Sequence, residues 1–326
     1  MTSPENRSCD LCGDGQFELI GELDRKGRPL RTVVCRTCGL VSHERIPTEE
    51  ELAAFYRERY REEYQGESSP SARRVMRAWK NARRIHGQLR AFLRPRARVL
   101  EIGAGIGCTV KFLEQCGYDA WGIEAHRGFC RYGRERLHAR LCESLVAELP
   151  SHTSADTVLL VHVIEHFRSP CGVLRRVRQW LPPNGLLYVE CPNLAAPFAL
   201  RSKMFHMAHI HNFTPRTLAM IARRCGFQVE CVFSRQDDPN LQMLFRTSRE
   251  SHDSIDPHSY RETMQALGRY DVFSYHLRWC YLRERFRKLT SYAIEHLTAG
   301  WYVRRLLQGI AAAEAAQSRD REPRAA

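Results

Sequence analysis

Between residues 96 and 190 the chain alternates between two patterns of apolar and polar positions. Short apolar runs of strand length are separated by stretches with the 3.6-residue period of amphipathic helices. The runs are residues 98–102, 120–123, 157–161 and 186–189, and the helical stretches lie near 109–116, 129–138 and 170–181. Strands that alternate with helices need crossover connections, so the pattern predicts an α/β fold with a parallel sheet covered on both faces.

The segments that follow and precede this region also carry structural signals. Two apolar segments at 227–233 and 241–247 are expected to close one edge of the sheet. Upstream, Thr48 and Glu51 have the spacing of a capping box, which predicts that a helix begins there. A second, arginine-rich amphipathic helix is predicted over 72–93, after a linker of Gly, Ser and Pro residues at 66–70.

Two short cysteine motifs lie near the N-terminus. Cys9 and Cys12 form one pair and Cys35 and Cys38 the other, each pair is followed by glycine, and 22 residues separate them. Paired spacing of this kind is typical of a structural Zn²⁺ site with four thiolate ligands. About 40 residues are too few to fold on a hydrophobic core alone, so a metal would supply the missing stability. The alternative is four unrelated buried cysteines.

The composition is that of a globular protein. Of the 326 residues, 43% are hydrophobic and 27% are charged, which excludes a disordered or fibrous chain. No apolar stretch reaches the ~20 residues of a membrane helix, and the N-terminal residues lack the apolar core of a signal peptide. We therefore expect a soluble, cytoplasmic protein without membrane insertion, whose 13 cysteines, apart from the two pairs, are reduced thiols.

The charge is positive but not concentrated. The formal net charge is +13, and five lysines leave 45 arginines among the 50 basic residues. The arginines are scattered among acidic residues along the chain, so a bias of composition toward arginine explains the charge as well as a polyanionic partner does.

A glycine-rich turn directly follows the first strand of the pattern. Gly103, Gly105 and Gly107 leave the backbone and the N-terminus of the next helix open to a ligand. Their spacing differs from that of the dinucleotide fingerprint. The second strand ends at Glu124, where a carboxylate can accept both ribose hydroxyls of an adenosine. Glu101, in the first strand, suits a ligand that carries a cationic amino acid.

These residues resemble the S-adenosylmethionine site of class I methyltransferases. The segments 157–166, 184–193 and 209–215 are similar to the same family, and the cysteine pairs resemble the zinc-ribbon lead-in of a bacterial subgroup, types 12 and 23, that includes enzymes acting on sugars and other small metabolites. The resemblance covers roughly residues 9–66 and 96–247. It implies a Rossmann-like fold with a seven-stranded, mostly parallel sheet, a small N-terminal zinc-ribbon domain and a helical C-terminal extension.

The resemblance also implies which residues bind S-adenosylmethionine. Glu101 and the three glycines would line the methionine and ribose end, and Glu124 would hold the ribose hydroxyls. The adenine ring would be flanked after the third strand, and two residues at the end of the fourth strand would lie beside the cofactor. The complete set is Glu101, Gly103, Gly105, Gly107, Glu124, Cys142, Glu143, Ser144, Val161 and His162.

Methyl transfer from a sulfonium depends mainly on orientation, but a hydroxyl or carbon acceptor also needs a base, and histidine titrates in the useful range. In the resembling enzymes a histidine four residues before the Phe of a Phe-Ser/Thr pair lies over the donor methyl; here that position is His209, our candidate general base. His211 is a second catalytic candidate, and Asn193, at the end of the fifth strand, could orient the acceptor. The alternative for His209 is a hydrogen-bonded lid residue.

One rival motif is present. His162, Glu165 and His166 match the H-x-x-E-H pattern of a class of zinc peptidases. Metal ligands with that spacing need a continuous helix, yet His162 directly follows a strand and Pro170 opens a new helix. We therefore interpret Glu165 and His166 as the turn and helix after the fourth strand, and we disfavour a peptidase.

The predicted function is methyl transfer from S-adenosylmethionine to a hydroxyl, or less favourably a carbon, of a small-molecule acceptor such as a sugar or sugar nucleotide. An RNA methyltransferase is the alternative, since a zinc ribbon and positive charge suit RNA. Against it, the Asn/Asp-Pro-Pro-Tyr/Phe motif of base amino-methylation does not follow the fourth strand. A protein that binds the cofactor without chemistry is a third hypothesis.

Four parts of the chain are predicted. They are a zinc-ribbon domain with its following helix over 1–66, a linker helix over 67–95, an S-adenosylmethionine-binding domain over 96–250, and a helical C-terminal extension with a frayed tail over 251–326. The extension could cover the substrate cleft or pair two chains as a homodimer.

Overall fold

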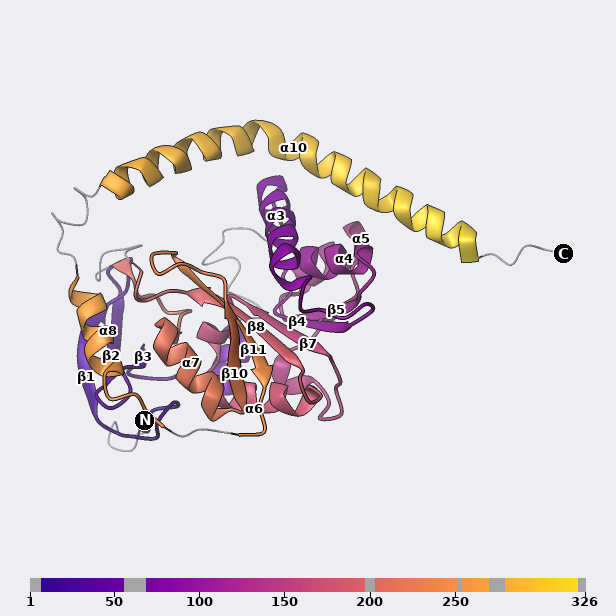
Figure 1. Ribbon diagram of the computed structural model, residues 1–326. Helices are drawn as coiled ribbons and strands as arrows, with labels where there is room; N and C mark the ends of the chain where they lie inside the picture. The colour runs from indigo at the N-terminus through magenta and orange to yellow at the C-terminus, as the bar shows by residue number, and fades with distance from the viewer. Residues whose placement is uncertain (1–6, 56–68, 197–202, 251–253, 270–278, 322–326) are drawn as a thin grey trace.

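A seven-stranded sheet forms the centre of the protein (Figure 1). The computed structural model describes residues 7–55, 69–196, 203–250, 254–269 and 279–321. The strand order is β10-β11-β8-β7-β4-β5-β6. The strands are β4 (Arg98–Ile102), β5 (Asp119–Glu124), β6 (Leu141–Glu143), β7 (Thr157–Val161), β8 (Leu186–Pro192), β10 (Phe227–Val232) and β11 (Asn240–Thr247). The five strands from β8 to β6 are parallel, and β11 runs antiparallel to both β8 and β10, so the predicted fold class is confirmed.

Helices cover both faces of this sheet. One face packs against α3, α4 and α5, and the other packs against α6 and α7. Successive residues of a parallel strand pack against helices on opposite faces of the sheet, as Val99 and Leu100 do in β4. Because both faces are buried, the strands are nearly continuous apolar runs. The helices and short 3₁₀ turns of this region are α3 (Ala72–Leu89), α4 (Cys108–Gln115), α5 (Arg127–Arg136), η3 (Val146–Glu148), η4 (Ile164–His166), α6 (Pro170–Trp180) and α7 (Pro215–Arg224).

Several local signals are confirmed. Helix α1 (Glu49–Ala54) has the predicted capping box, in which the Thr48 side chain accepts from the backbone of Glu51 and the Glu51 side chain accepts from the backbone of Thr48. Helix α7 follows Thr214, whose side chain accepts from the Thr217 backbone N–H. The helix predicted over 72–93 ends at Leu89 and packs against α4.

The cysteine motifs belong to a second, smaller sheet with the order β1-β2-β3-β9, all antiparallel. Its strands are β1 (Phe17–Leu23), β2 (Pro29–Cys35), β3 (Val41–His43) and β9 (His211–Asn212). We call this sheet with its cysteine motifs the ribbon. Strand β9, which the sequence pattern did not predict, comes from the segment between β8 and α7. Local periodicity cannot reveal a two-residue strand whose partner residues, Val41 and Ser42, are so distant in sequence.

The ribbon shares a core with the central sheet. Leu11 and Leu40 are buried in the same apolar cluster as the residues of α6 and α7. In addition, the Asp10 carboxylate accepts hydrogen bonds from the Ser169 hydroxyl at 2.5 Å and from the Cys171 backbone N–H at 2.8 Å. Asp10 therefore caps the N-terminus of α6 from within the first cysteine motif.

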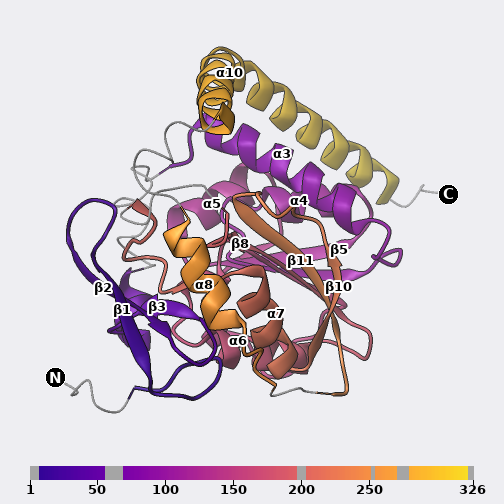
Figure 2. The same ribbon diagram turned by 60° about the vertical axis from the view of Figure 1, so that its left-hand side comes forward.

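The C-terminal extension is helical, as predicted, and its first helix covers the ribbon. Helix α8 (Ser259–Gly268) lies beside β1 to β3 (Figure 2). The Ser259 hydroxyl donates to the Cys38 carbonyl oxygen at 2.7 Å, and the Tyr260 hydroxyl donates to Glu18 at 2.6 Å. The second cysteine motif is therefore enclosed by residues more than 200 positions away.

This enclosure predicts unequal effects at two glycines. Gly13 and Gly39 have φ of +81° and +73°, but an added Cβ would meet no described atom within 4 Å at Gly13 and the Ser259 carbonyl oxygen at 2.7 Å at Gly39. Both Gly→Ala variants carry backbone strain, and only Gly39→Ala also displaces α8. We expect Gly39→Ala to lower the free energy of unfolding by about 1–3 kcal/mol more than Gly13→Ala, measured by urea denaturation. Equal losses would contradict the close approach.

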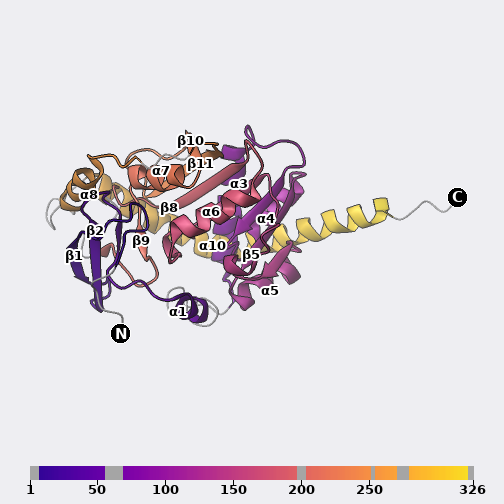
Figure 3. The same ribbon diagram turned by 90° about the horizontal axis from the view of Figure 1, so that it is seen from below.

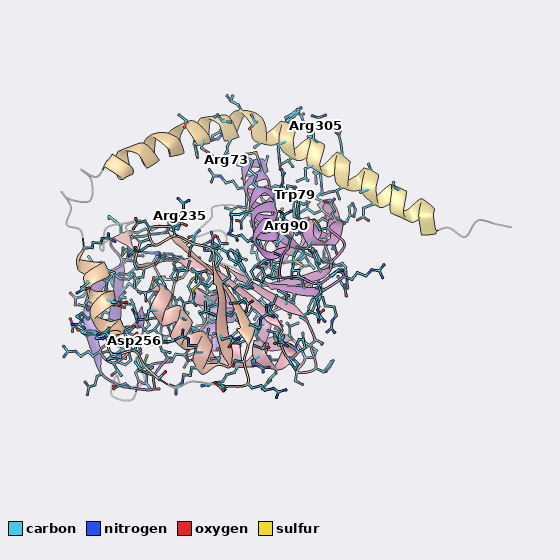
Figure 4. The ribbon with its side chains drawn as sticks, in the orientation of Figure 1. Arg73, Trp79, Arg90, Arg235, Asp256 and Arg305 are labelled. Atoms are coloured by element: carbon cyan, nitrogen blue, oxygen red, sulfur yellow. The ribbon has the colours of Figure 1, made fainter. Side chains whose placement is uncertain are left out.

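The last helix, α10 (Trp279–Arg321), passes over α3 (Figures 1 and 2). Arg73 of α3 points toward it: the guanidinium lies 4.4 Å from the centre of the Tyr292 ring, and Nη1 lies 2.9 Å from His296 Nε2 (Figure 4). Leu297, on the same helix, is 85% exposed. The homodimer stays a prediction. The alanine-rich tail was predicted to be frayed, but α10 continues through it to Arg321. Residues 322–326, like residues 66–68 of the predicted linker, lie outside the described residues.

Two expectations from composition can be compared with the structure. Within the described ranges, no helix has both the length and the apolar character needed to cross a membrane. The cysteines described there form no disulfide.

Candidate active site

A cavity of about 490 Å³ lies at the carboxyl ends of the parallel strands, a size typical of small-molecule sites. The glycine-rich turn and the ends of β4, β5 and β7 form one side of it. Residues of α1 and α3 form another, and Figure 3 shows α1 between the ribbon and α5. The lining includes seven of the predicted cofactor-binding residues: Glu101, Gly103, Gly105, Glu124, Ser144, Val161 and His162.

The glycine-rich turn is tied to the end of β5. The three glycines Gly103, Gly105 and Gly107 all have positive φ, which side chains with a Cβ rarely adopt. The Gly105 N–H donates to one oxygen of the Glu124 carboxylate at 2.8 Å, and the His126 N–H donates to the other oxygen at 2.9 Å. Glu124 is therefore held in one orientation beside the turn, where its remaining lone pairs can accept ribose hydroxyls.

Glu101 is a buried acid that suits a cationic ligand. Its side chain lines the cavity, the residue is 4% exposed, and among the described residues its Oε2 has no hydrogen-bond partner. Burial, together with the negative charge of Glu124, raises the pKa of Glu101 to about 8. A sulfonium or ammonium group would stabilise the carboxylate form. The residues present therefore fit S-adenosylmethionine, whose methionine end carries both groups.

The pKa of Glu101 predicts proton release on cofactor binding. At pH 7 a carboxyl with a pKa of about 8 is mostly protonated, and a bound cation lowers that pKa, so binding should release close to one proton per ligand. Calorimetry at pH 7 in two buffers with different ionisation enthalpies measures this release. We expect it to disappear in Glu101→Gln and to fall as the pH rises above 8. Identical enthalpies in both buffers for the wild-type chain would contradict the prediction.

Three of the predicted cofactor residues do not line the cavity. Gly107 caps α4 in the left-handed conformation, and an added Cβ would meet Leu141 and Ala139, so it shapes the turn. Cys142 and Glu143 are exposed on β6. Because this strand ends at Glu143, it is Ser144, one residue further, that reaches the edge where the cavity lies.

His162 lies at the end of β7 with φ of +55°, an uncommon conformation for a non-glycine residue. Its Nδ1 is 3.5 Å from the Glu165 carboxylate, and its Nε2 is 3.7 Å from the Glu190 carboxylate. Burial opposes the charged form, but the two carboxylates outweigh it and raise the pKa of His162 to about 10. Glu190 also accepts from the Arg84 guanidinium of α3, which connects this helix to the cavity wall.

The three predicted catalytic residues have different surroundings in the structure. His209 Nε2 lies 3.9 Å from Glu165 Oε1, and the His209 ring packs edge-on against His166, which lines the cavity. Burial and the neighbouring His166, His206 and His162 lower the pKa of His209 well below its usual value. Neutral imidazole is therefore its form at pH 7.

His211 and Asn193 are buried away from the cavity lining. His211, in β9, is 2% exposed, and its Nε2 lies 3.2 Å from the Arg168 carbonyl oxygen. Asn193 is fully buried; its amide N–H groups donate to the backbone carbonyls of Gln236 and Asp238, and its side-chain oxygen accepts from the Ala195 N–H. These contacts hold loops in place and leave both side chains turned to the backbone.

Other cavity residues were not predicted as functional. Glu165 and His166 come from the 3₁₀ turn η4, which confirms the interpretation of H-x-x-E-H as a turn after the fourth strand. His166 and two residues of α3, Arg74 and Asn81, line the cavity. The polar residues of an amphipathic helix give no local signal of facing a site, because most such residues face solvent.

The four ribbon cysteines are arranged as metal ligands. The Sγ atoms of Cys9 and Cys38 are 3.5 Å apart, those of Cys12 and Cys35 are 3.4 Å apart, and all four lie within 4.8 Å of one another. Tetrahedral Zn²⁺ with Zn–S bonds of about 2.3 Å places its sulfur ligands about 3.8 Å apart. The donor set and spacing therefore fit a closed structural zinc site.

Residues 71–232 match the family model described as a methyltransferase domain. Among curated proteins, the ubiquinone biosynthesis O-methyltransferase of Xanthomonas euvesicatoria pv. vesicatoria is 26% identical over 165 residues, which are 44% of this chain and 67% of that protein. The magnesium protoporphyrin IX methyltransferase structure from Synechocystis PCC 6803 has a TM-score of 0.48 at 13% identity and covers 62% of this chain and 100% of its own. The 1,6-didemethyltoxoflavin-N1-methyltransferase structure from Burkholderia thailandensis has a TM-score of 0.47 at 20% identity and covers 64% and 96%.

The sheet is parallel except for β11, which lies next to the edge strand β10, and the glycine-rich turn is held by Glu124 at the end of β5. These two features define an α/β protein with a site for a nucleotide-type ligand. Together with the family match, they confirm the predicted resemblance. Residues 71–232 therefore belong to a methyltransferase-domain family, and the sheet around them has the fold of class I S-adenosylmethionine-dependent methyltransferases.

Proposed function

We propose that this methyltransferase transfers a methyl group to a hydroxyl oxygen of a sugar-type or other small metabolite. The observation that carries the proposal is the group of Glu165, His166 and His209. His166 lines the cofactor cavity, and ligand atoms of Glu165 and His209 lie within 4.8 Å of its own. A carboxylate and imidazoles in that place can orient a hydroxyl and take its proton. The curated relative is named an O-methyltransferase, which supports oxygen over carbon as the acceptor.

The transfer is an in-line displacement. A lone pair of the acceptor oxygen forms the new C–O bond while the C–S bond breaks and its electron pair goes to sulfur. The sulfonium charge disappears, so a cavity poor in water costs little, and orientation supplies most of the rate. The hydroxyl proton passes to His209 Nε2. Burial and the neighbouring histidines lower the pKa of His209, and the Glu165 carboxylate, 3.9 Å away, offsets part of the cost of the imidazolium that forms.

The proposal includes two bound groups. S-adenosylmethionine supplies the methyl group; Glu101 would face its methionine end, Glu124 its ribose and Ser144 its adenine. A structural Zn²⁺ on Cys9, Cys12, Cys35 and Cys38 would hold the ribbon, and through Asp10 the N-terminus of α6. Closed sites with four cysteines do not take part in catalysis.

Incubation of the chain with methyl-labelled S-adenosylmethionine and separate pools of small metabolites and RNA tests the function. We expect label in the metabolite pool, with hydroxylated sugars among the acceptors, and none with Glu124→Ala, which should not hold the donor. Label that enters the RNA pool alone would overturn the proposal and favour the RNA methyltransferase hypothesis.

A further inference from the structure

Three imidazoles converge on one buried carboxylate at the edge of the cavity. His162 Nδ1, His209 Nε2 and His166 Nε2 lie 3.5, 3.9 and 4.0 Å from Glu165 Oε1. Glu165 is 1% exposed, and within the described part of the chain neither of its oxygens has a hydrogen-bond partner. A buried carboxylate without hydrogen bonds is costly. His162 offsets part of this cost from 3.5 Å away, and a cation bound between Glu165, His166 and His209 would offset more of it.

The spacing suits a metal cation. One ligand atom each from Glu165, His166 and His209 lies within 4.8 Å of the others. Ligands bound at about 2.1 Å to one ion are about 3.0–3.6 Å apart at angles of 90–120°. The distances of 3.9 and 4.0 Å from Glu165 to the two histidines therefore need only a small inward movement of the side chains.

One hydrogen bond orients His166 for this role. Its Nδ1 lies 2.6 Å from the Ala208 carbonyl oxygen. A carbonyl only accepts, so Nδ1 carries the proton, and in the neutral ring Nε2 then carries the lone pair that faces the cluster. Histidines that bind metals typically make this kind of hydrogen bond to a backbone carbonyl. The same bond holds the segment that carries His209 against η4.

We propose that Glu165, His166 and His209 bind a divalent cation of intermediate hardness, such as Zn²⁺, Fe²⁺, Mn²⁺ or Co²⁺, at the cavity. Two imidazoles with one carboxylate are a donor set for such ions. Glu165 and His166 of the H-x-x-E-H pattern would thus be metal ligands without lying on a long helix, because the fold brings His209 to them as the third ligand. This site is distinct from the cysteine site in the ribbon.

The effect of the cation on catalysis rests on the proposed function. Three protein ligands leave coordination positions for an acceptor oxygen, and a bound cation lowers the pKa of a hydroxyl. The hydroxyl proton then goes to water and the oxygen lone pair attacks the methyl carbon, with the same departure of the sulfur. With the cation present, His209 acts as a ligand, and the cation takes over the activation of the acceptor.

Titration of the full zinc-containing chain with Mn²⁺ tests the site, with free Mn²⁺ followed by electron paramagnetic resonance. Mn²⁺ prefers oxygen and imidazole over thiolates, so the ribbon cysteines do not compete. We expect one Mn²⁺ per wild-type chain and binding weakened more than about 100-fold in Glu165→Gln and in His209→Gln, since even outer-shell changes cost 10–100-fold. The control His152→Gln, at an exposed turn position, should bind as the wild type does.

Binding of S-adenosylhomocysteine by the same variants shows that they are folded, because neither Glu165 nor His209 lines the cofactor cavity. Absence of Mn²⁺ binding by the wild-type chain, or unchanged binding by both variants, would overturn the site. Methyl transfer that persists in a wild-type chain unable to bind Mn²⁺ would overturn this inference alone. Intact Mn²⁺ binding without transfer to any metabolite would support the site and count against the proposed function.

Discussion

Replacement of Glu124 by alanine is expected to weaken binding of S-adenosylmethionine by at least about 100-fold. Two charge-assisted hydrogen bonds to the ribose would be lost, each worth about 1.5–3 kcal/mol, and 100-fold corresponds to about 2.7 kcal/mol. The variant would also free the Gly105 and His126 N–H groups that Glu124 accepts, so the glycine-rich turn would lose its anchor. Isothermal titration calorimetry with S-adenosylmethionine and S-adenosylhomocysteine measures the change.

Glu143 provides a matched control for this experiment. It pairs directly with Glu124 across β5 and β6, but its side chain is exposed and does not line the cavity. We expect Glu143→Ala to bind the cofactor within about twofold of the wild type, because an exposed acid outside the cavity contributes little. Equal losses in the two variants would show that general charge, and not the position of Glu124, controls binding.

Replacement of His209 by glutamine is expected to lower kcat by about 10²–10⁴, the range for loss of a general base. Affinity for S-adenosylmethionine should change less than about twofold, because His209 does not line the cofactor cavity. Steady-state rates with the acceptor found by the labelling experiment, together with calorimetric cofactor affinity, separate the two effects. A loss of affinity equal to the loss of rate would contradict the role of His209 at the acceptor end.

His211 is the comparison residue for His209 because it is close in sequence and was also predicted as catalytic. Its contact with the Arg168 carbonyl and its place in β9, the ribbon strand that contacts η4, give it a structural role. We expect His211→Gln to lower thermal stability and to retain kcat within about tenfold. A loss of kcat as large as in His209→Gln, in a variant with unchanged stability, would restore His211 as a catalytic residue.

The cofactor side of the site was predictable because its signals are local. Gly103 and Gly105 follow a strand whose Val99, Leu100 and Ile102 are apolar. Glu124 ends the next strand, so the parallel arrangement alone brings them to one edge. The cysteine pairs were predictable for the same reason, since each pair is a turn with its own spacing. Of the three residues predicted around the adenine, Ser144 lines the cavity and Cys142 and Glu143 do not. The reason is that β6 continues to Glu143, and a sequence pattern does not fix the end of a strand to within one or two residues.

The acceptor side depended on contacts between distant segments. The only sequence motif that contains Glu165 and His166 belongs to a different fold. His209 lies beside them because the Ala208 carbonyl accepts a hydrogen bond from His166 and because β9 pairs with β3 of the ribbon. By itself, the sequence determined the strands and helices of the central sheet, the cofactor turn and the four thiolates, since these follow from periodicity and short-range geometry. Tertiary structure alone decided that the ribbon shares the main core, that α8 covers it, and that a carboxylate and imidazoles from separate segments meet at the cavity, because such meetings depend on packing energies summed over the whole chain.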